Sequence, residues 1–197
     1  MYYSLAMLLK ARAGFPIFLA ALNMRAGLVL MAPLVPIISE YFSLSKIQMS
    51  LLLSIPVIAF SSSSLIMGYL GRRASSDRII TLALVFLTIG LTLRIFTGLY
   101  GLFIFTALVG VSIAVMNYEI PVWVKLHLPE SSGLITGIYV TLMGVGAAVA
   151  TAISVPIAES SHFSWRLSMA PWVLFSFVAT IYWLNQRRRF SFKSKSD

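Results

Sequence analysis

The sequence contains no cysteine, only two histidines and only six acidic residues in 197. The absence of cysteine excludes disulfide bonds, thiolate nucleophiles and Cys-ligated zinc or iron–sulfur sites. His127 and His162 fall in loops on opposite sides of the predicted membrane spans, and no His-Glu-x-x-His, Gly-x-Ser-x-Gly or Walker-type phosphate loop occurs. We therefore predict no catalytic residue, no metal site and no cofactor, and we expect the protein not to be an enzyme.

Charge is scarce as well. Only 11% of the residues are charged and 59% are hydrophobic, with a mean hydropathy of +0.91, whereas an average soluble domain has roughly 25% charged residues. The net charge of +9 resides in short basic clusters between apolar stretches rather than on one folded face. This pattern argues against nucleic acid as a partner and predicts an integral membrane protein surrounded by lipid.

Six apolar stretches are long enough to cross a bilayer as helices, which takes about 20 residues each. They are residues 14–38, 47–70, 79–96, 99–124, 133–158 and 165–184. Transmembrane barrel strands need only about 9 to 11 alternating residues, so these runs exclude a barrel. We predict an all-α membrane protein with a six-helix bundle over 14–184, a cytoplasmic N-terminus over 1–13 and a basic cytoplasmic tail over 185–197.

The basic residues predict the orientation. The N-terminus, two of the loops and the tail carry most of them, whereas the opposite side holds only Lys46 and Arg166. The positive-inside rule therefore places both termini in the cytoplasm, with the chain in the inner (cytoplasmic) membrane. Tryptophans near the span ends, among them Trp123, Trp165 and Trp183, are typical of an interfacial aromatic belt.

Two charges lie at membrane depth, Arg25 in the first span and Glu119 in the fourth. An arginine at the centre of a helix costs about 2.5–3.5 kcal/mol on insertion scales, so it usually faces protein, water or a bound anion. Arg25 is predicted to bind an anionic or strongly polar solute, or alternatively to form a permanent ion pair with Glu119. Glu119 is itself a candidate solute ligand and could also carry a proton. Arg94, two residues from the external end of its span, is expected to extend to the headgroups.

Asparagines precede both charges, in Leu22-Asn23-Met24-Arg25 and Met116-Asn117-Tyr118-Glu119. This recurrence in spans one and four fits an inverted repeat of three plus three helices. Asn23 and Asn117 are candidate solute ligands, or else interhelical hydrogen-bonding groups. The fifth span also carries small residues at near-regular steps, which predicts close packing against another helix. They are Gly133, Gly137, Thr141, Gly144, Ala148 and Ala152.

Several segments together resemble a known family over nearly the whole chain. They include Leu22 to Arg25 with Pro33-Leu34-Val35-Pro36, Leu53 to Val57, Gly110 to Asn117 with Pro121 and Lys125, Gly133 to Tyr139, Val155 to Ala158, and Trp165-Arg166. They are similar to the cyanate-permease and nitroimidazole-transporter-like branch of the major facilitator superfamily. The resemblance implies a secondary transporter for small, often anionic or nitro-aromatic solutes, with spans one and four lining the cavity. Arg25 falls on the family's membrane-embedded arginine.

The chain departs from that family in three places. Ala26 stands where the family commonly has proline, and Arg72 stands where the superfamily usually has aspartate, with Asp77-Arg78 five residues later. The fifth span also lacks the Gly-Pro motif of drug/proton antiporters. Arg72 and Arg73, with Glu119, are the residues we expect to take part in gating or coupling.

The resemblance covers only the N-terminal half of a facilitator, whose solute lies between two six-helix halves. We expect the chain to act as half of a transporter that moves a small-molecule solute by alternating access. A separately encoded second half is a possible partner, and a homodimer is another. The alternatives are a truncated, non-transporting remnant or a membrane subunit, and a membrane-embedded enzyme is less favoured.

Overall fold

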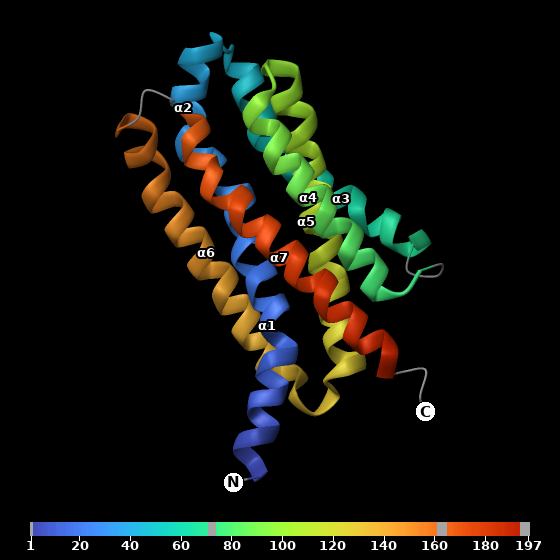
Figure 1. Cartoon of the computed structure of the whole chain (residues 1–197). Helices are drawn as coiled ribbons and strands as arrows, with labels where there is room; N and C mark the ends of the chain where they lie inside the picture. Colours follow the sequence, from blue (N-terminus) through green and yellow to red (C-terminus); the bar gives the residue numbers. More distant parts are fainter. Residues whose placement is uncertain (1, 71–73, 161–164, 194–197) are drawn as a thin grey trace.

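The computed structural model describes residues 2–70, 74–160 and 165–193, with side chains over 15–62, 67, 74–160 and 165–185. The described chain is helical except for short connections (Figure 1). Its elements are α1 (Tyr2–Val29), α2 (Met31–Phe42), α3 (Lys46–Leu70), α4 (Ser76–Phe96), α5 (Leu99–His127), the 3-10 turn η1 (Pro129–Ser131), α6 (Ser132–Ser160) and α7 (Trp165–Lys193).

The helices make six antiparallel crossings, because α1 and α2 form one bent crossing. The bend is 42° at Leu30. Pro33 lies just after it and cannot donate the backbone hydrogen bond that a straight helix would make to Val29, which accounts for the break. Among the described residues four helices are long and apolar enough to span a membrane, and the bent pair makes five. The described apolar part of α3, Lys46–Ser62, is shorter.

The pattern of helix contacts relates the two triplets of crossings. The first crossing packs on α6 and α7, the fourth crossing, α5, packs on α3 and α4, and α4 packs on α7. Exchanging the first three crossings with the last three reproduces these contacts, as expected for an inverted repeat. The packing of α6 on α7 has no counterpart of similar extent between α3 and α4 among the described residues. The start of α1 and the end of α7 lie toward the same end of the bundle, and the α4–α5 hairpin lies at the opposite end (Figure 1).

Two glycines permit the closest of these contacts. Gly146 of α6 lies directly against the backbone carbonyl of Leu22 in α1. Gly110 of α5 lies against α3, where a Cβ would come 2.9 Å from the Cβ of Ala59 and 3.1 Å from the Cα of Pro56. Each glycine removes the side chain at the point where two backbones approach, which is how helices associate without a hydrophobic driving force between them.

The small residues that were expected to pack α6 against a neighbour face outward instead. The buried residues of α6 are Ile135, Tyr139, Met143, Gly146, Ala150, Ser154 and Ala158. Each of the six small residues lies two positions before one of them, about 200° away around the helix. All six are exposed, and a Cβ added at Gly133, Gly137 or Gly144 would meet nothing within 4 Å. The prediction of close packing is therefore wrong within this bundle.

The expected aromatic belt is also wrong for three tryptophans. Trp123, Trp165 and Trp183 are almost completely buried among the helices. Two of them make polar contacts inside the bundle: the Trp123 indole donates to Asp77 at 2.7 Å, and the Trp183 indole donates to the Thr81 hydroxyl at 3.2 Å. These tryptophans therefore join helices rather than anchoring the protein in the headgroups.

Candidate functional site

Arg25 and Asn23 lie on different sides of α1. Arg25 is exposed, whereas Asn23 is 0% exposed. α5, α6 and α7 contact α1, and the exposure of Arg25 shows that one side of α1 is left uncovered by the described helices. The guanidinium of Arg25 lies on that side. It has no hydrogen bond or ion pair to any residue that the structure describes, so all its donors are available to a ligand from outside the bundle.

Asn23 is a buried polar group of another kind. Among the described residues, neither its amide nitrogen nor its amide oxygen has a hydrogen-bond partner. A buried amide without partners costs free energy, so such groups tend to mark a functional role or a place that another group or water occupies. The interior of the bundle, and not the face of Arg25, is where this side chain could act.

Glu119 and Asn117 on α5 do not reproduce the arrangement on α1. Glu119 is 3% exposed, and its Oε2 is buried without a hydrogen-bond partner among the described residues. Asn117 is half-buried and donates to the carbonyl oxygen of Ile113 in its own helix at 3.0 Å. Within the part of the chain that the structure covers, no ion pair joins Glu119 to Arg25. The alternative of a permanent Arg25–Glu119 pair is therefore not realised in this conformation.

Arg94 was expected to extend to the headgroups, and the structure contradicts this. It is 0% exposed and points into the bundle, where both terminal nitrogens donate to the carbonyl oxygen of Gly27 at 3.3 and 3.4 Å. Its Nε has no partner among the described residues. Gly27 lies three residues before the bend in the first crossing. Arg94 thus links α4 to the bent first crossing. Its position near a helix end gave no indication of this contact in the sequence.

The polar contact at the start of α4 was not foreseen either. Asp77, in the first turn of α4, accepts the indole hydrogen of Trp123, whose ring stacks on His127 with centroids 4.4 Å apart. This contact fixes the start of α4 against the end of α5. Arg72 and Arg73, the expected gating residues, lie outside the described residues. No group of three potential metal-ligating side chains occurs in the part of the chain that was described.

Comparison with known proteins gives consistent matches. Residues 17–196 match the model of the Major Facilitator Superfamily. The chain is 31% identical over 172 residues to the uncharacterized transporter YycB of Bacillus subtilis and 32% identical over 172 residues to a 2-nitroimidazole transporter of Escherichia coli. It is 25% identical to the cyanate transport protein CynX of E. coli. Each alignment covers 87% of this chain but only 43% or 44% of the relative, so the chain spans less than half the length of these relatives.

Proposed function

Because this chain belongs to the Major Facilitator Superfamily, we propose that it is half of a secondary active transporter which moves a small anionic or strongly polar solute by alternating access. The fold is that of the N-terminal half of a facilitator, and the relatives are transporters of this family. In this proposal the chain lies in the cytoplasmic membrane with both termini in the cytoplasm. The observation that carries it is the exposure of Arg25 on the side of α1 that this bundle leaves uncovered.

A second six-helix bundle would cover the outward faces of α3 and α6. Small side chains are exposed on both faces: the α6 stripe described above, and Ser50, Ser54 and Ser61 of α3. The hydroxyls of Ser54 and Ser61 donate to backbone carbonyls of their own helix, so they leave a smooth surface. Smooth faces of small residues favour helix contact over lipid contact. We propose a separately encoded second half as the partner, with a second copy of this chain as the alternative.

The side chains divide into two roles in this proposal. Arg25 would bind the solute between the two bundles, since a guanidinium offers a rigid fork of donors to a carboxylate-like group. Glu119, Asn23 and Asn117 would act inside the bundle during transport. Glu119 would be the coupling group that exchanges a proton. Arg72 and Arg73 would take part in gating at the cytoplasmic side. Asn23 and Glu119 are buried and Asn117 is half-buried, so these three residues would act with Arg25 rather than touch the same solute atoms.

The proposal is tested by measuring uptake and efflux of labelled cyanate and 2-nitroimidazole in cells that produce the chain. We expect movement above the background of empty cells when the chain is produced together with a six-helix product encoded beside it. Membrane fractionation must show that the chain is inserted in every case. Correct insertion with no movement of either solute, alone or with the neighbouring product, would contradict the proposal and favour a non-transporting subunit or remnant.

Adding a large side chain to the α6 stripe should block assembly. We expect Ala148→Trp to reduce solute movement about tenfold or more, because an indole would hold the two helices apart and overpacking costs about 1–3 kcal/mol. The matched control is Leu82→Trp, which adds an indole to an exposed residue of α4 away from the stripe. Equal transport by the two variants would place the partner elsewhere. Since the chain has no cysteine, Ala148→Cys with an oxidant tests separately for a second copy.

A further inference from the structure

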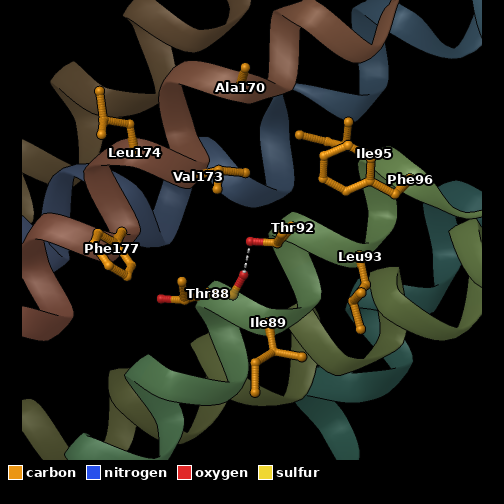
Figure 2. Close-up of a pocket in the computed structure, with 10 residues that line it drawn as sticks. All are labelled: Thr88, Ile89, Thr92, Leu93, Ile95, Phe96, Ala170, Val173, Leu174 and Phe177. Carbon is orange, nitrogen blue, oxygen red and sulfur yellow. Dashed lines mark hydrogen bonds between the residues drawn. The ribbon is translucent and has the colours of Figure 1, made fainter.

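A groove of about 800 Å³ opens between α4 and α7 on the outside of the bundle (Figure 2). Side chains of the two helices face each other across it, from Thr88 to Phe96 on α4 and from Ala170 to Phe177 on α7. This volume lies within the range of about 300–1,000 Å³ that is typical of small-molecule sites. The groove is distinct from the face of Arg25, which lies on another helix.

The walls of the groove are apolar in effect. Besides two threonines, its lining is aliphatic or aromatic. The Thr92 hydroxyl donates to the carbonyl oxygen of Thr88, and the Thr88 hydroxyl donates to that of Leu84. Both donors are thus used within α4. A polar solute would gain little hydrogen bonding here, whereas a hydrocarbon chain would lose nothing by entering.

The length of the groove corresponds to one membrane leaflet. Its inner end is closed where the Thr88 hydroxyl meets the hydroxyls of Ser176 and Thr180, at 2.8 and 3.0 Å. From Thr88 to Phe96, the last residue of α4, the helix rises about 12 Å. One leaflet contributes about 15 Å of hydrocarbon. The groove therefore begins near the middle of the bilayer and reaches the surface at the end that carries the α4–α5 hairpin.

A cation lies where the groove reaches the surface. A second hollow of about 350 Å³ shares Ile95, Phe96 and Ala170 with the groove and is also lined by Arg166. The Nε of Arg166 donates to the carbonyl oxygen of Ile95 at 2.9 Å, and one terminal nitrogen donates to the Tyr41 hydroxyl at 3.2 Å. The guanidinium carbon also lies 4.8 Å from the Trp165 ring centre. These contacts fix the guanidinium beside the opening.

All of these partners are neutral. No carboxylate lies within ion-pair distance of Arg166 among the residues that the structure describes, so its positive charge is not compensated there. Arginine held by backbone and aromatic contacts, with a free edge at the headgroup level, is well suited to a phosphate. An apolar groove one leaflet long that ends at such a cation is complementary to a phospholipid.

We propose that the α4–α7 groove is a specific phospholipid site, in which one acyl chain lies between the helices from Thr88 to Phe96 and the phosphate binds Arg166. The lipid comes from the leaflet at the hairpin end of the bundle. It fills the space between α4 and α7 beyond their hydroxyl contact and so supports the packing of the two helices there. Solute binding at Arg25 does not depend on it.

The test is native mass spectrometry of the full chain, delipidated and titrated with phosphatidylglycerol or with diacylglycerol of the same acyl chains. We expect Arg166→Gln to weaken phosphatidylglycerol binding about fivefold and to leave diacylglycerol binding unchanged, because only the phosphate contact is lost. Ala170→Trp should weaken binding of both about fivefold, because it fills the groove. Arg166→Lys, which keeps the charge but loses the contact to Ile95, should fall between wild type and Arg166→Gln.

The controls are Lys46→Gln, which removes an exposed cation at the same end of the bundle, and Val178→Trp, which adds an indole to α7 outside the groove. Both should bind phosphatidylglycerol as the wild type does. Equal weakening by Val178→Trp and Ala170→Trp would show a non-specific lipid annulus and overturn the proposal. Unchanged phosphatidylglycerol binding by Arg166→Gln would overturn it too, as would displacement of the lipid by 2-nitroimidazole. A thermal melt of each variant establishes that the bundle is folded.

Discussion

Replacing Arg25 by alanine is expected to weaken solute binding about thirtyfold or more while the protein still inserts into the membrane. Loss of one member of a desolvated charge pair costs about 2–5 kcal/mol. Arg25→Lys keeps the charge but loses the two-pronged geometry, so we expect an intermediate loss of about tenfold. The measurement is the concentration dependence of cyanate and 2-nitroimidazole uptake in cells where the wild type transports them. Insertion should be unaffected, because removing a membrane-depth charge lowers its cost.

The matched control is Lys46→Ala, which removes an exposed cation at the end of the bundle. Unchanged half-saturation in Arg25→Ala would assign Arg25 a purely structural role. A second measurement separates the roles of Arg25 and Glu119. Since they form no ion pair in this conformation, the effects of Arg25→Gln and Glu119→Gln on the free energy of unfolding should add within about 0.5 kcal/mol. A larger coupling energy would mean that the two side chains meet.

Substitution of Gly146 by alanine is expected to destabilise the bundle by about 3 kcal/mol or more, at the upper end of the range for overpacking. The new methyl group would meet the backbone carbonyl of Leu22. A backbone atom cannot turn away as a flexible side chain can, so α1 and α6 would have to separate along their contact. Unfolding of the purified protein in mixed micelles, followed by tryptophan fluorescence, measures the change.

Gly144 provides the matched control two residues earlier in the same helix. A Cβ there meets nothing within 4 Å, so Gly144→Ala should be neutral or slightly stabilising through higher helix propensity. Gly110→Ala should be destabilising by less than Gly146→Ala, because a Cβ at Gly110 approaches Ala59 and Pro56 less closely than a Cβ at Gly146 approaches the Leu22 carbonyl. If Gly144→Ala and Gly146→Ala unfold at the same denaturant concentration, α1 and α6 are farther apart than the approach of Gly146 to the Leu22 carbonyl indicates.

Much of the architecture could be predicted from the sequence. The long apolar runs gave helix positions close to those observed, because a helix is the form in which a single segment satisfies its own backbone in lipid. The prolines and glycines contributed less than the apolar runs to the prediction of the architecture. The bend at Leu30 in the first crossing was not predicted.

The candidate site was harder to predict. Arg25 was recognised by its cost at membrane depth, yet its exposure and the burial of Asn23 depend on how α1 packs. Arg94 was misinterpreted, because a position near a helix end does not tell whether the side chain faces the headgroups or another helix. Only the packing of α4 against the first crossing puts it beside Gly27. An arginine two residues inside a span can extend toward the headgroups or toward a neighbouring helix, so the sequence was consistent with both orientations.

The sequence by itself determined that this protein spans the membrane repeatedly as helices, with few and therefore informative polar residues. Those properties follow from composition and from the thickness of the bilayer. Only the tertiary structure decided which side of each helix is buried, since lipid is as apolar as leucine and an apolar pattern does not distinguish the two environments. It turned the small residues of α6 outward and Gly146 inward, and it left Arg25 facing a side that the described helices do not cover.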